Sequence, residues 1–364
     1  MDYKGRLKRL QQTLSLQKLD GLLISHLPNI HYLCGFTGSS AILLITQRKP
    51  VFFTDGRYTT QARDEVIGAR IVISRKAVLA AAGEWLGAHR KQLGKGRIGI
   101  EAEHMTVSDR ARVSALLPSG IQLKPAPTMV EQARMAKDKD EIARLRAAVI
   151  LGASLFNVAL EAIRPGAREV EVAAKMEYQA RRSGADQMSF ETIIASGERS
   201  ALPHGRASEA VIPNDGFVVC DFGVILTGYC SDMTRTVYVG RPPEEACRLY
   251  HAVLAAQQAA VEAVKPGVST GEIDQVARKV LQKQGFGRYF THSTGHGVGL
   301  EIHEAPRVAT GQNEILRPGM VITIEPGAYI PGKWGARIED MVVVTESGCE
   351  VLTPTSKDLI AING

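Results

Sequence analysis

The chain has 364 residues, of which 45% are apolar and 23% are charged. These values exclude a disordered, collagen-like or small disulfide-stapled protein, and a chain of this length more often forms two domains than one. The 44 Lys and Arg against 38 Asp and Glu give a net charge of +6, which is unevenly distributed. Residues 1–127 carry 19 basic and 9 acidic side chains, a net of +10, which leaves residues 128–364 with a net of −4.

The basic first part has two interpretations, a nucleic-acid-binding surface or an ordinary solvated one. We favour the solvated surface, because the basic residues are scattered and no basic motif with interleaved aromatic residues is present. We therefore expect no nucleic-acid partner. The slightly acidic second part fits a site that gathers cations.

The sequence gives no indication of secretion or of a membrane span. Residues Met1–Leu10 are charged and lack the apolar region of a secretory signal, and no run of about 18 apolar residues is present. The cysteines are odd in number and lack the spacing of a disulfide framework. We expect a reduced, cytoplasmic protein without a membrane partner; its five cysteines are Cys34, Cys220, Cys230, Cys247 and Cys349.

The first part alternates strand-like and helix-like segments, which is typical of an α/β sheet covered by helices. Stiff, helix-breaking residues follow at Lys124–Pro127, and we place the domain boundary there, with domains at 1–127 and 128–364. Strands are predicted at 20–25, 40–46, 50–54 and 97–101, and helices at 60–66 and 78–93.

The second part opens with a predicted amphipathic helix at 139–160 and then repeats itself. The segment AIRPG at 162–166 precedes a predicted helix, and AVKPG at 263–267 precedes another. Each copy continues to an apolar strand that ends in a carboxylate, Asp221 or Glu325. We predict an α+β domain with an internal pseudo-twofold duplication, although Pro-Gly helix ends are common enough to recur by coincidence.

Asp221 and Asp232 flank a predicted hairpin whose turn lies near 226–228. A two-residue turn pairs positions whose numbers have an odd sum, so both carboxylates fall on one face. Two aspartates in apolar surroundings repel each other unless a cation lies between them. Solvated hairpin carboxylates are the alternative for this pair taken alone.

The second half supplies further ligand-type residues. Glu325 ends an apolar strand, and Glu339 precedes a strand that the run Met341–Val344 predicts to be buried. Between the halves, the segment THSTGHGVGLEIHE at 291–304 carries three histidines, which offer neutral nitrogen ligands or proton carriers. Four carboxylates and one histidine suit two divalent cations such as Mn²⁺, Co²⁺ or Zn²⁺, roughly 3.5–4 Å apart, which would ionise a shared water molecule.

This ordered set of motifs resembles the metallopeptidases with the pita-bread fold, which include methionine aminopeptidases, Xaa-Pro aminopeptidases and Xaa-Pro dipeptidases (prolidases). The resemblance implies an α/β creatinase-like N-terminal domain and an α+β pita-bread catalytic domain. It implies that Glu325 also moves a proton and that Asp221 and Glu339 bridge the ions. The implied metal ligands are Asp221, Asp232, His296, Glu325 and Glu339.

The same resemblance implies roles for residues beside the ligands. His303 would stabilise the developing oxyanion, and His204 would lie near the substrate and the leaving group. His292 and Arg337 match the proline-specific branch of the family; Arg337 could also simply neutralise carboxylates. A lone histidine more often has a structural role, and only membership in the motif set favours these functions.

Within the family, a methionine aminopeptidase usually lacks so large an N-terminal domain, and creatinase lacks the metal ligands. We expect an Xaa-Pro aminopeptidase that uses a metal-bridging hydroxide on peptides with proline in the second position. An Xaa-Pro dipeptidase is the alternative, and it needs a cationic or histidine group for the proline carboxylate. A non-catalytic binding module is a further alternative, disfavoured because no ligand is missing. Dimers are common in the family, so a homodimer or higher homo-oligomer is expected.

Overall fold

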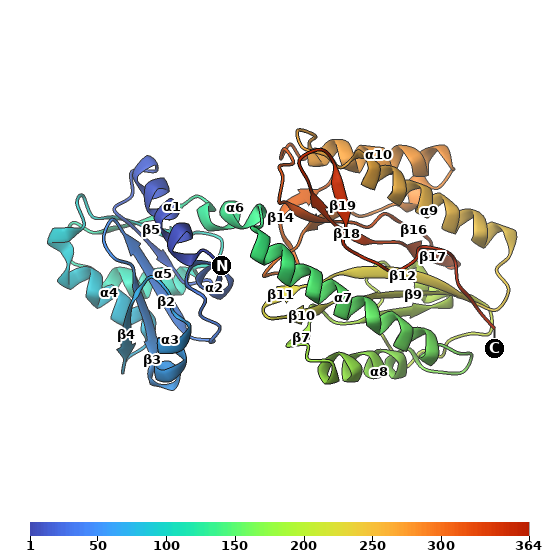
Figure 1. Cartoon of the computed structure of the whole chain (residues 1–364), viewed down its shortest axis with the longest axis horizontal. Helices are drawn as coiled ribbons and strands as arrows, with labels where there is room; N and C mark the ends of the chain where they lie inside the picture. Colours follow the sequence, from blue (N-terminus) through green and yellow to red (C-terminus); the bar gives the residue numbers. More distant parts are fainter. Residues whose placement is uncertain (364) are drawn as a thin grey trace. The chain divides into compact units, whose positions relative to one another are not determined.

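The computed structural model describes residues 1–363 and divides into two compact units, Met1–Arg134 and a second unit that begins at Met135 (Figure 1). The boundary expected at residue 127 therefore lies too early. Lys124–Pro127 is not a linker, because Pro125 belongs to a strand at the edge of the first sheet, opposite Ile100. An edge strand tolerates proline, which cannot donate a ladder hydrogen bond.

The first unit is an α/β domain around a six-stranded mixed sheet with the strand order β4-β3-β2-β1-β5-β6. Helices α4 and α5 cover one face through Ala82, Leu86 and Val113, and the ring of Phe36 packs at 4.8 Å against Phe52 of β3. The elements are α1 (Tyr3–Leu16), β1 (Gly21–Ile24), α2 (Leu27–Cys34), β2 (Ala41–Thr46), β3 (Val51–Asp55), α3 (Thr59–Glu65), β4 (Arg70–Ser74), α4 (Val78–Ala88), β5 (Arg97–Glu101), α5 (Val107–Leu116), β6 (Gln122–Ala126) and α6 (Met129–Met135).

The second unit places helices on both sides of its strands, with α7 and α8 on one side and α9 and α10 on the other (Figure 1). Its helices are α7 (Lys139–Ala162), α8 (Glu169–Arg182), α9 (Glu244–Ala263) and α10 (Thr270–Lys283). Its strands are β7 (Gln187–Met188), β8 (Ile193–Ser196), β9 (Gly216–Phe222), β10 (Val224–Leu226), β11 (Tyr229–Cys230), β12 (Met233–Val239), β13 (Gly295–Gly297), β14 (Glu304–Val308), β15 (Val321–Ile324), β16 (Gly327–Ile330), β17 (Trp334–Arg337), β18 (Asp340–Val344), β19 (Cys349–Val351) and β20 (Ala361–Ile362).

The predicted duplication is present in the second unit. The first half arranges strands as β20-β12-β9-β8, and the second as β14-β13-β15-β18-β19. After α7, Gly166 has φ 84° and its N–H donates to the carbonyl of Ile212; after α9, Gly267 has φ 86° and donates to Leu316. The helices that follow these turns, α8 and α10, each have 14 residues. The repeat in the sequence therefore corresponds to a structural repeat and not to a coincidence of helix ends.

The hairpin that carries the first carboxylates has the predicted register. Thr227 and Gly228 form the turn at φ 50° and 83°, and Leu226 pairs with Tyr229. Further along the same hairpin, Asp221 of β9 lies directly opposite Thr234 of β12. Asp232 is two residues before Thr234, so its side chain falls on the same face as Asp221, diagonally across the pair.

Helix α7 is long and apolar enough to cross a membrane by length and composition alone, with a mean hydropathy of 1.5 in its most apolar window. The same composition is typical of a helix in the core of a globular domain. Here Leu145, Leu155 and Phe156 are buried, and Leu155 and Phe156 pack in the core of the first half with residues of α8 and β9. The helix starts at a capping box between Asp138 and Glu141.

Candidate metal centre

The five predicted metal ligands come from equivalent places in the two halves. Asp221 lies within β9 and Asp232 immediately precedes β12, whereas Glu325 immediately follows β15 and Glu339 immediately precedes β18. His296 is the middle residue of β13, which pairs with β15 through Gly297. Antiparallel pairing of short, buried strands thus fixes the positions of residues that are more than a hundred positions apart.

The structure brings these side chains together. His296 Nε2 lies 3.5 Å from Asp232 Oδ2 and 3.4 Å from Glu325 Oε1. One donor atom each from Asp232, His296 and Glu339 lies within 4.8 Å of the others. His296 Nδ1 is 3.0 Å from the carbonyl oxygen of Gly297, so that Nδ1–H donates there and Nε2 is left with a lone pair directed to the carboxylates.

The carboxylates are crowded and removed from water. Burial, with the negative charges of Glu339 and Asp221, raises the pKa of Asp232 well above its usual range. Burial and the charge of Glu325 do the same to the pKa of Glu339, and burial raises the pKa of Glu325 to about 7. Burial lowers the pKa of His296, which favours the neutral imidazole that a metal requires.

This donor set fits divalent cations. Asp221 Oδ1 is buried without a hydrogen-bond partner among the described residues, although a buried carboxylate oxygen is costly to leave unpaired. Several carboxylates that repel one another around a neutral imidazole are stabilised by positive charge between them. Oxygen and nitrogen donors of this kind suit Mn²⁺, Co²⁺ or Zn²⁺.

Arg337 links the ligands to the rest of the site. Its guanidinium donates to Asp221 Oδ2, to Thr234 Oγ1 at 3.1 Å and to the hydroxyl of Tyr329 at 2.6 Å. Thr234 in turn donates to Glu339 Oε2 at 2.7 Å. Burial alone would lower the pKa of Arg337, but Tyr329 and the carboxylates raise it well above the ordinary value. Arg337 is therefore a fixed cation that orients two of the predicted ligands.

Three histidines predicted to act on the substrate surround this cluster. His292 Nε2 lies 3.0 Å from the Tyr329 hydroxyl, and burial lowers its pKa to about 3. The ring of His303 is 4.4 Å from that of His296, and burial lowers its pKa as well. His204 is exposed and acts electrostatically on His292, His303 and Glu325.

Sequence reasoning missed Tyr329 and Thr234. Tyr329 joins Arg337 to His292 and is buried, and Thr234 joins Arg337 to Glu339. A usable signal existed for Thr234, because it lies two residues after Asp232 in a buried strand and so faces the same side. No comparable signal marked Tyr329, whose role depends on residues of β17 and of the loop before β13.

Arg307 was also missed. It lies in β14 directly opposite His296 of β13, so both side chains project from the same face of the ladder. Arg307 is exposed. Arg307 is therefore an exposed arginine on the same face of the β13–β14 ladder as the predicted ligand His296.

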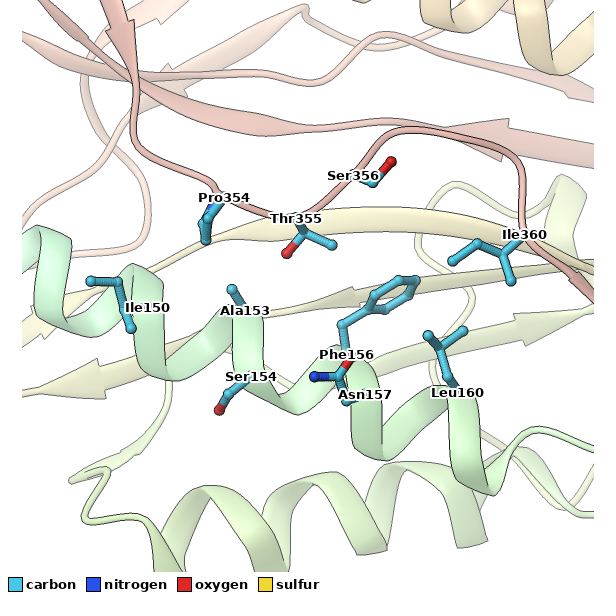
Figure 2. Close-up of a pocket in the computed structure, with 10 residues that line it drawn as sticks. All are labelled: Ile150, Ala153, Ser154, Phe156, Asn157, Leu160, Pro354, Thr355, Ser356 and Ile360. Atoms are coloured by element: carbon cyan, nitrogen blue, oxygen red, sulfur yellow. The ribbon is translucent and has the colours of Figure 1, made fainter.

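A groove on the second unit is a different feature. It has a volume of about 400 Å³ and is lined by α7 and by the segment around Pro354–Ile360 (Figure 2). Ile150, Phe156 and Leu160 belong to its apolar lining, and none of the predicted site residues lines it. The groove therefore lacks the ionisable groups that hydrolysis needs, which are all found at the cluster described above.

An α/β domain followed by a duplicated α+β domain, with buried carboxylates and a histidine converging between its halves, defines a two-domain metallopeptidase. The comparisons agree: residues 143–346 match Metallopeptidase family M24, and residues 6–136 match the Creatinase/Prolidase N-terminal domain. The chain belongs to Metallopeptidase family M24, as the resemblance implied.

Several relatives resemble the chain over its whole length. It is 36% identical to an Xaa-Pro dipeptidase of Pyrococcus horikoshii, covering 98% of both chains. A solved Xaa-Pro dipeptidase from Bacillus anthracis is 39% identical with a TM-score of 0.95, covering 99% of this chain and 100% of that one. An X-Pro aminopeptidase structure from Thermotoga maritima is 36% identical with a TM-score of 0.88, covering 98% and 100%.

Proposed function

We propose that this metallopeptidase is an Xaa-Pro dipeptidase, which hydrolyses dipeptides with a C-terminal proline. This activity was the alternative to the Xaa-Pro aminopeptidase first expected. The observation that carries the proposal is Arg307, an exposed arginine paired with the predicted ligand His296 in the β13–β14 ladder. We propose it as the cationic partner that the free carboxylate of a dipeptide needs. The full-length similarity to two Xaa-Pro dipeptidases supports the same choice.

Two divalent cations would be held by Asp221, Asp232, His296, Glu325 and Glu339. When bound, such ions lower the pKa of a water molecule and polarise a carbonyl group. We propose Mn²⁺ as the native ion; metal analysis of the purified protein tests that choice.

Glu325 is the group that would carry a proton in this reaction. Its carboxylate lies 3.4 Å from the ligand His296, and a carboxylate beside the attacking water can accept a proton and release it again. The leaving nitrogen of an Xaa-Pro bond belongs to the proline ring and must gain a proton as the bond breaks. Glu325 would take a proton from the attacking water and deliver it to that nitrogen.

The neighbouring histidines and Arg337 would bind and orient the substrate. His303 is neutral at pH 7, because burial lowers its pKa, and a neutral imidazole can donate one hydrogen bond. It would donate to the scissile carbonyl oxygen, an interaction that strengthens as negative charge develops there. His204 and His292 would line the side of the site that receives proline, and Arg337 would keep Asp221 and Glu339 in place.

The deciding experiment compares three substrates with the same first residue and added Mn²⁺: an Xaa-Pro dipeptide, its C-terminal amide, and an Xaa-Pro-Xaa tripeptide. We expect preference for the free dipeptide. A charge-assisted hydrogen bond contributes about 1.5–3 kcal/mol, so Arg307→Gln should raise the KM for the dipeptide by roughly 10- to 100-fold while the amide changes less than about twofold. Arg182→Gln, which replaces an exposed arginine on α8, is the control.

An Xaa-Pro aminopeptidase is the second candidate, and the similarity to the Thermotoga maritima enzyme favours it. Preference for the tripeptide, with no selective effect of Arg307→Gln on the dipeptide, would establish this alternative. Hydrolysis of none of the three substrates would reject both.

We also propose a cytoplasmic homo-oligomer. Light scattering of the purified chain tests the oligomeric state, and cell fractionation tests the location.

A further inference from the structure

Two buried carboxylates outside the metal cluster occupy equivalent helices of the two halves, α8 and α10. Glu169 begins α8 and Asp274 lies in the second turn of α10, and the side chain of each is 0% exposed. Each pairs with an arginine whose side chain is about one-third exposed, 33% for Arg199 and 32% for Arg278. None of the four is a candidate ligand, and the proposed reaction does not use them.

Asp274 holds the segment that leads into β13. Its Oδ1 accepts hydrogen bonds from the N–H of Thr294 at 3.2 Å and from its hydroxyl at 2.8 Å. Its Oδ2 accepts from Thr310 at 2.7 Å and from Arg278 Nε at 2.7 Å. The carbonyl of Thr294 then accepts the N–H of Glu325 at 2.8 Å. Asp274 thus holds Thr294, the residue directly before β13, and Thr294 in turn holds the backbone of the predicted ligand Glu325.

Arg278 extends the same contact to His292. One terminal nitrogen donates to the carbonyl of Phe290 at 3.1 Å, and the other donates to the carbonyl of His292 itself. The guanidinium also lies 4.3 Å over the Phe290 ring, which packs edge-on against the imidazole of His292 at 5.1 Å. Arg278, fixed by Asp274, therefore holds both the backbone and one side of the ring of His292.

Glu169 and Arg199 make the corresponding contacts in the first half. Glu169 accepts hydrogen bonds from the N–H and hydroxyl of Ser196, both at 2.8 Å, and from those of Ser208 at 3.1 and 2.8 Å. Arg199 donates to Glu169 at 3.0 Å and to the carbonyl of Arg206 at 2.7 Å. These hydrogen bonds tie together the two ends of the loop 196–208, which carries His204.

Loops that carry catalytic groups ordinarily lie at the mobile end of the stability range. A small misplacement of a substrate-binding group is costly, since it removes the alignment on which the reaction depends. A buried carboxylate that orients a planar, multiply donating guanidinium limits such motion, because each arginine holds more than one point of its loop.

We propose that Arg278 and Arg199, each oriented by its buried carboxylate, are positioning residues that hold His292 and His204, respectively, for the peptidase reaction. The inference rests on the proposed function, in which both histidines bind the substrate. It assigns one carboxylate–arginine clamp to each half of the duplicated domain.

The test crosses Arg278→Gln and Arg199→Gln with His292→Ala and His204→Ala, and measures kcat/KM on an Xaa-Pro dipeptide for the metal-loaded full chain. We expect Arg278→Gln to lower kcat/KM about tenfold in the parent and in His204→Ala, but less than about twofold in His292→Ala, because residues that act through one another are not additive. Arg199→Gln should show the reverse. Equal factors in both histidine backgrounds would overturn the proposal and leave only a general structural role.

A second measurement does not require activity. In Zn²⁺-loaded protein with ¹⁵N-labelled histidines, Arg278→Gln should shift the ring signals of His292 and leave those of His204 in place, and Arg199→Gln should do the opposite. Signals that stay unchanged, or that move together in both variants, would overturn the proposal. A chain that hydrolyses no Xaa-Pro peptide yet shows the selective shifts would reject the proposed function and retain the clamps. If Arg278→Gln does not fold, Arg278→Lys replaces it in both measurements. Lysine keeps a positive charge beside Asp274 but lacks the planar guanidinium that donates to two carbonyl groups at once.

Discussion

Glu325→Gln should make the metal-free protein more stable at pH 8 and leave its stability unchanged near pH 4. Burial raises the pKa of Glu325 from 4.5 to about 7 in the folded chain. Below pH 4.5 the carboxyl group is protonated in both the folded and unfolded states and has no differential effect. Between pH 4.5 and 7 the unfolded chain loses this proton first, so the free energy of unfolding falls as pH rises.

The size of this effect follows from the shift. One pKa unit corresponds to about 1.4 kcal/mol, so the wild-type chain loses about 3 kcal/mol through Glu325 by pH 8. In a unit of this size that equals roughly 6–12 °C in Tm. Asp232 and Glu339, whose pKa values are raised in the same direction, also lower the unfolding free energy of the wild type as the pH rises. The charge of Glu325 contributes to both of these shifts, so the difference between the two proteins contains the shift of Glu325 together with the part of theirs that its charge causes.

The assay is thermal unfolding in a chelator from pH 4 to pH 8 for the wild type, Glu325→Gln and the control Glu161→Gln, an exposed position on α7. The Glu325→Gln curve should separate from the other two as the pH rises, and saturating metal should remove its advantage. The same variant should have lost turnover, because glutamine cannot carry the proton. A Tm difference that does not vary with pH, or retained turnover, would refute this reasoning.

Three further outcomes follow from buried or strained contacts. Tyr329→Phe removes the acceptor of Arg337 and the partner of His292; kcat/KM should fall about tenfold with a small change in Tm, and an unchanged kcat/KM would contradict the link. Lys137→Met removes the ammonium that lies 2.6 Å from the buried Glu304, and the free energy of unfolding in urea should fall by about 3–5 kcal/mol. The double variant Lys137→Met/Glu304→Gln should recover much of this loss, and a single variant as stable as the wild type would argue against the pair. Thr227→Asn should stabilise the hairpin by up to about 1 kcal/mol, since a β-branched residue is strained at φ 50°; a loss of stability in the same assay would count against turn strain.

The features that could be predicted are those that depend on local patterning. The odd-sum rule is sufficient to align Asp221 with Asp232, because a tight turn fixes the pairing of both strands. The predicted helix at 139–160 agrees with α7, whose amphipathic face and capping box are local. Helix α2 was not predicted; its proline at the first turn is compatible with a helix but looks like a break in isolation. Strand β4 was also missed, although its run Ile71–Ile73 is apolar and β-branched, as strands usually are.

The parts of the site that could not be predicted depend on contacts between distant segments. Tyr329 matters because Arg337 and His292 both reach it, and only the folded sheet brings β16, β17 and the loop before β13 together. Arg307 stands opposite His296 across a ladder whose register shifts at His296 and Gly297, and such a bulge has no reliable sequence signal. The five ligands were identifiable earlier because their motifs recur as a set in a known family.

The distribution of the carboxylates over the two halves has a consequence for biogenesis. One buried apolar cluster lies in the first half, and the other joins the second half to Phe217 and Tyr238 of the first, whereas Asp221 and Asp232 belong to one half and Glu325 and Glu339 to the other. The shared apolar cluster and the buried Arg235–Asp340 pair therefore hold the two halves together, while the like charges of the carboxylates oppose close packing around them until cations arrive. A chain made under metal starvation would therefore stay joined through this core and be least stable around the carboxylates.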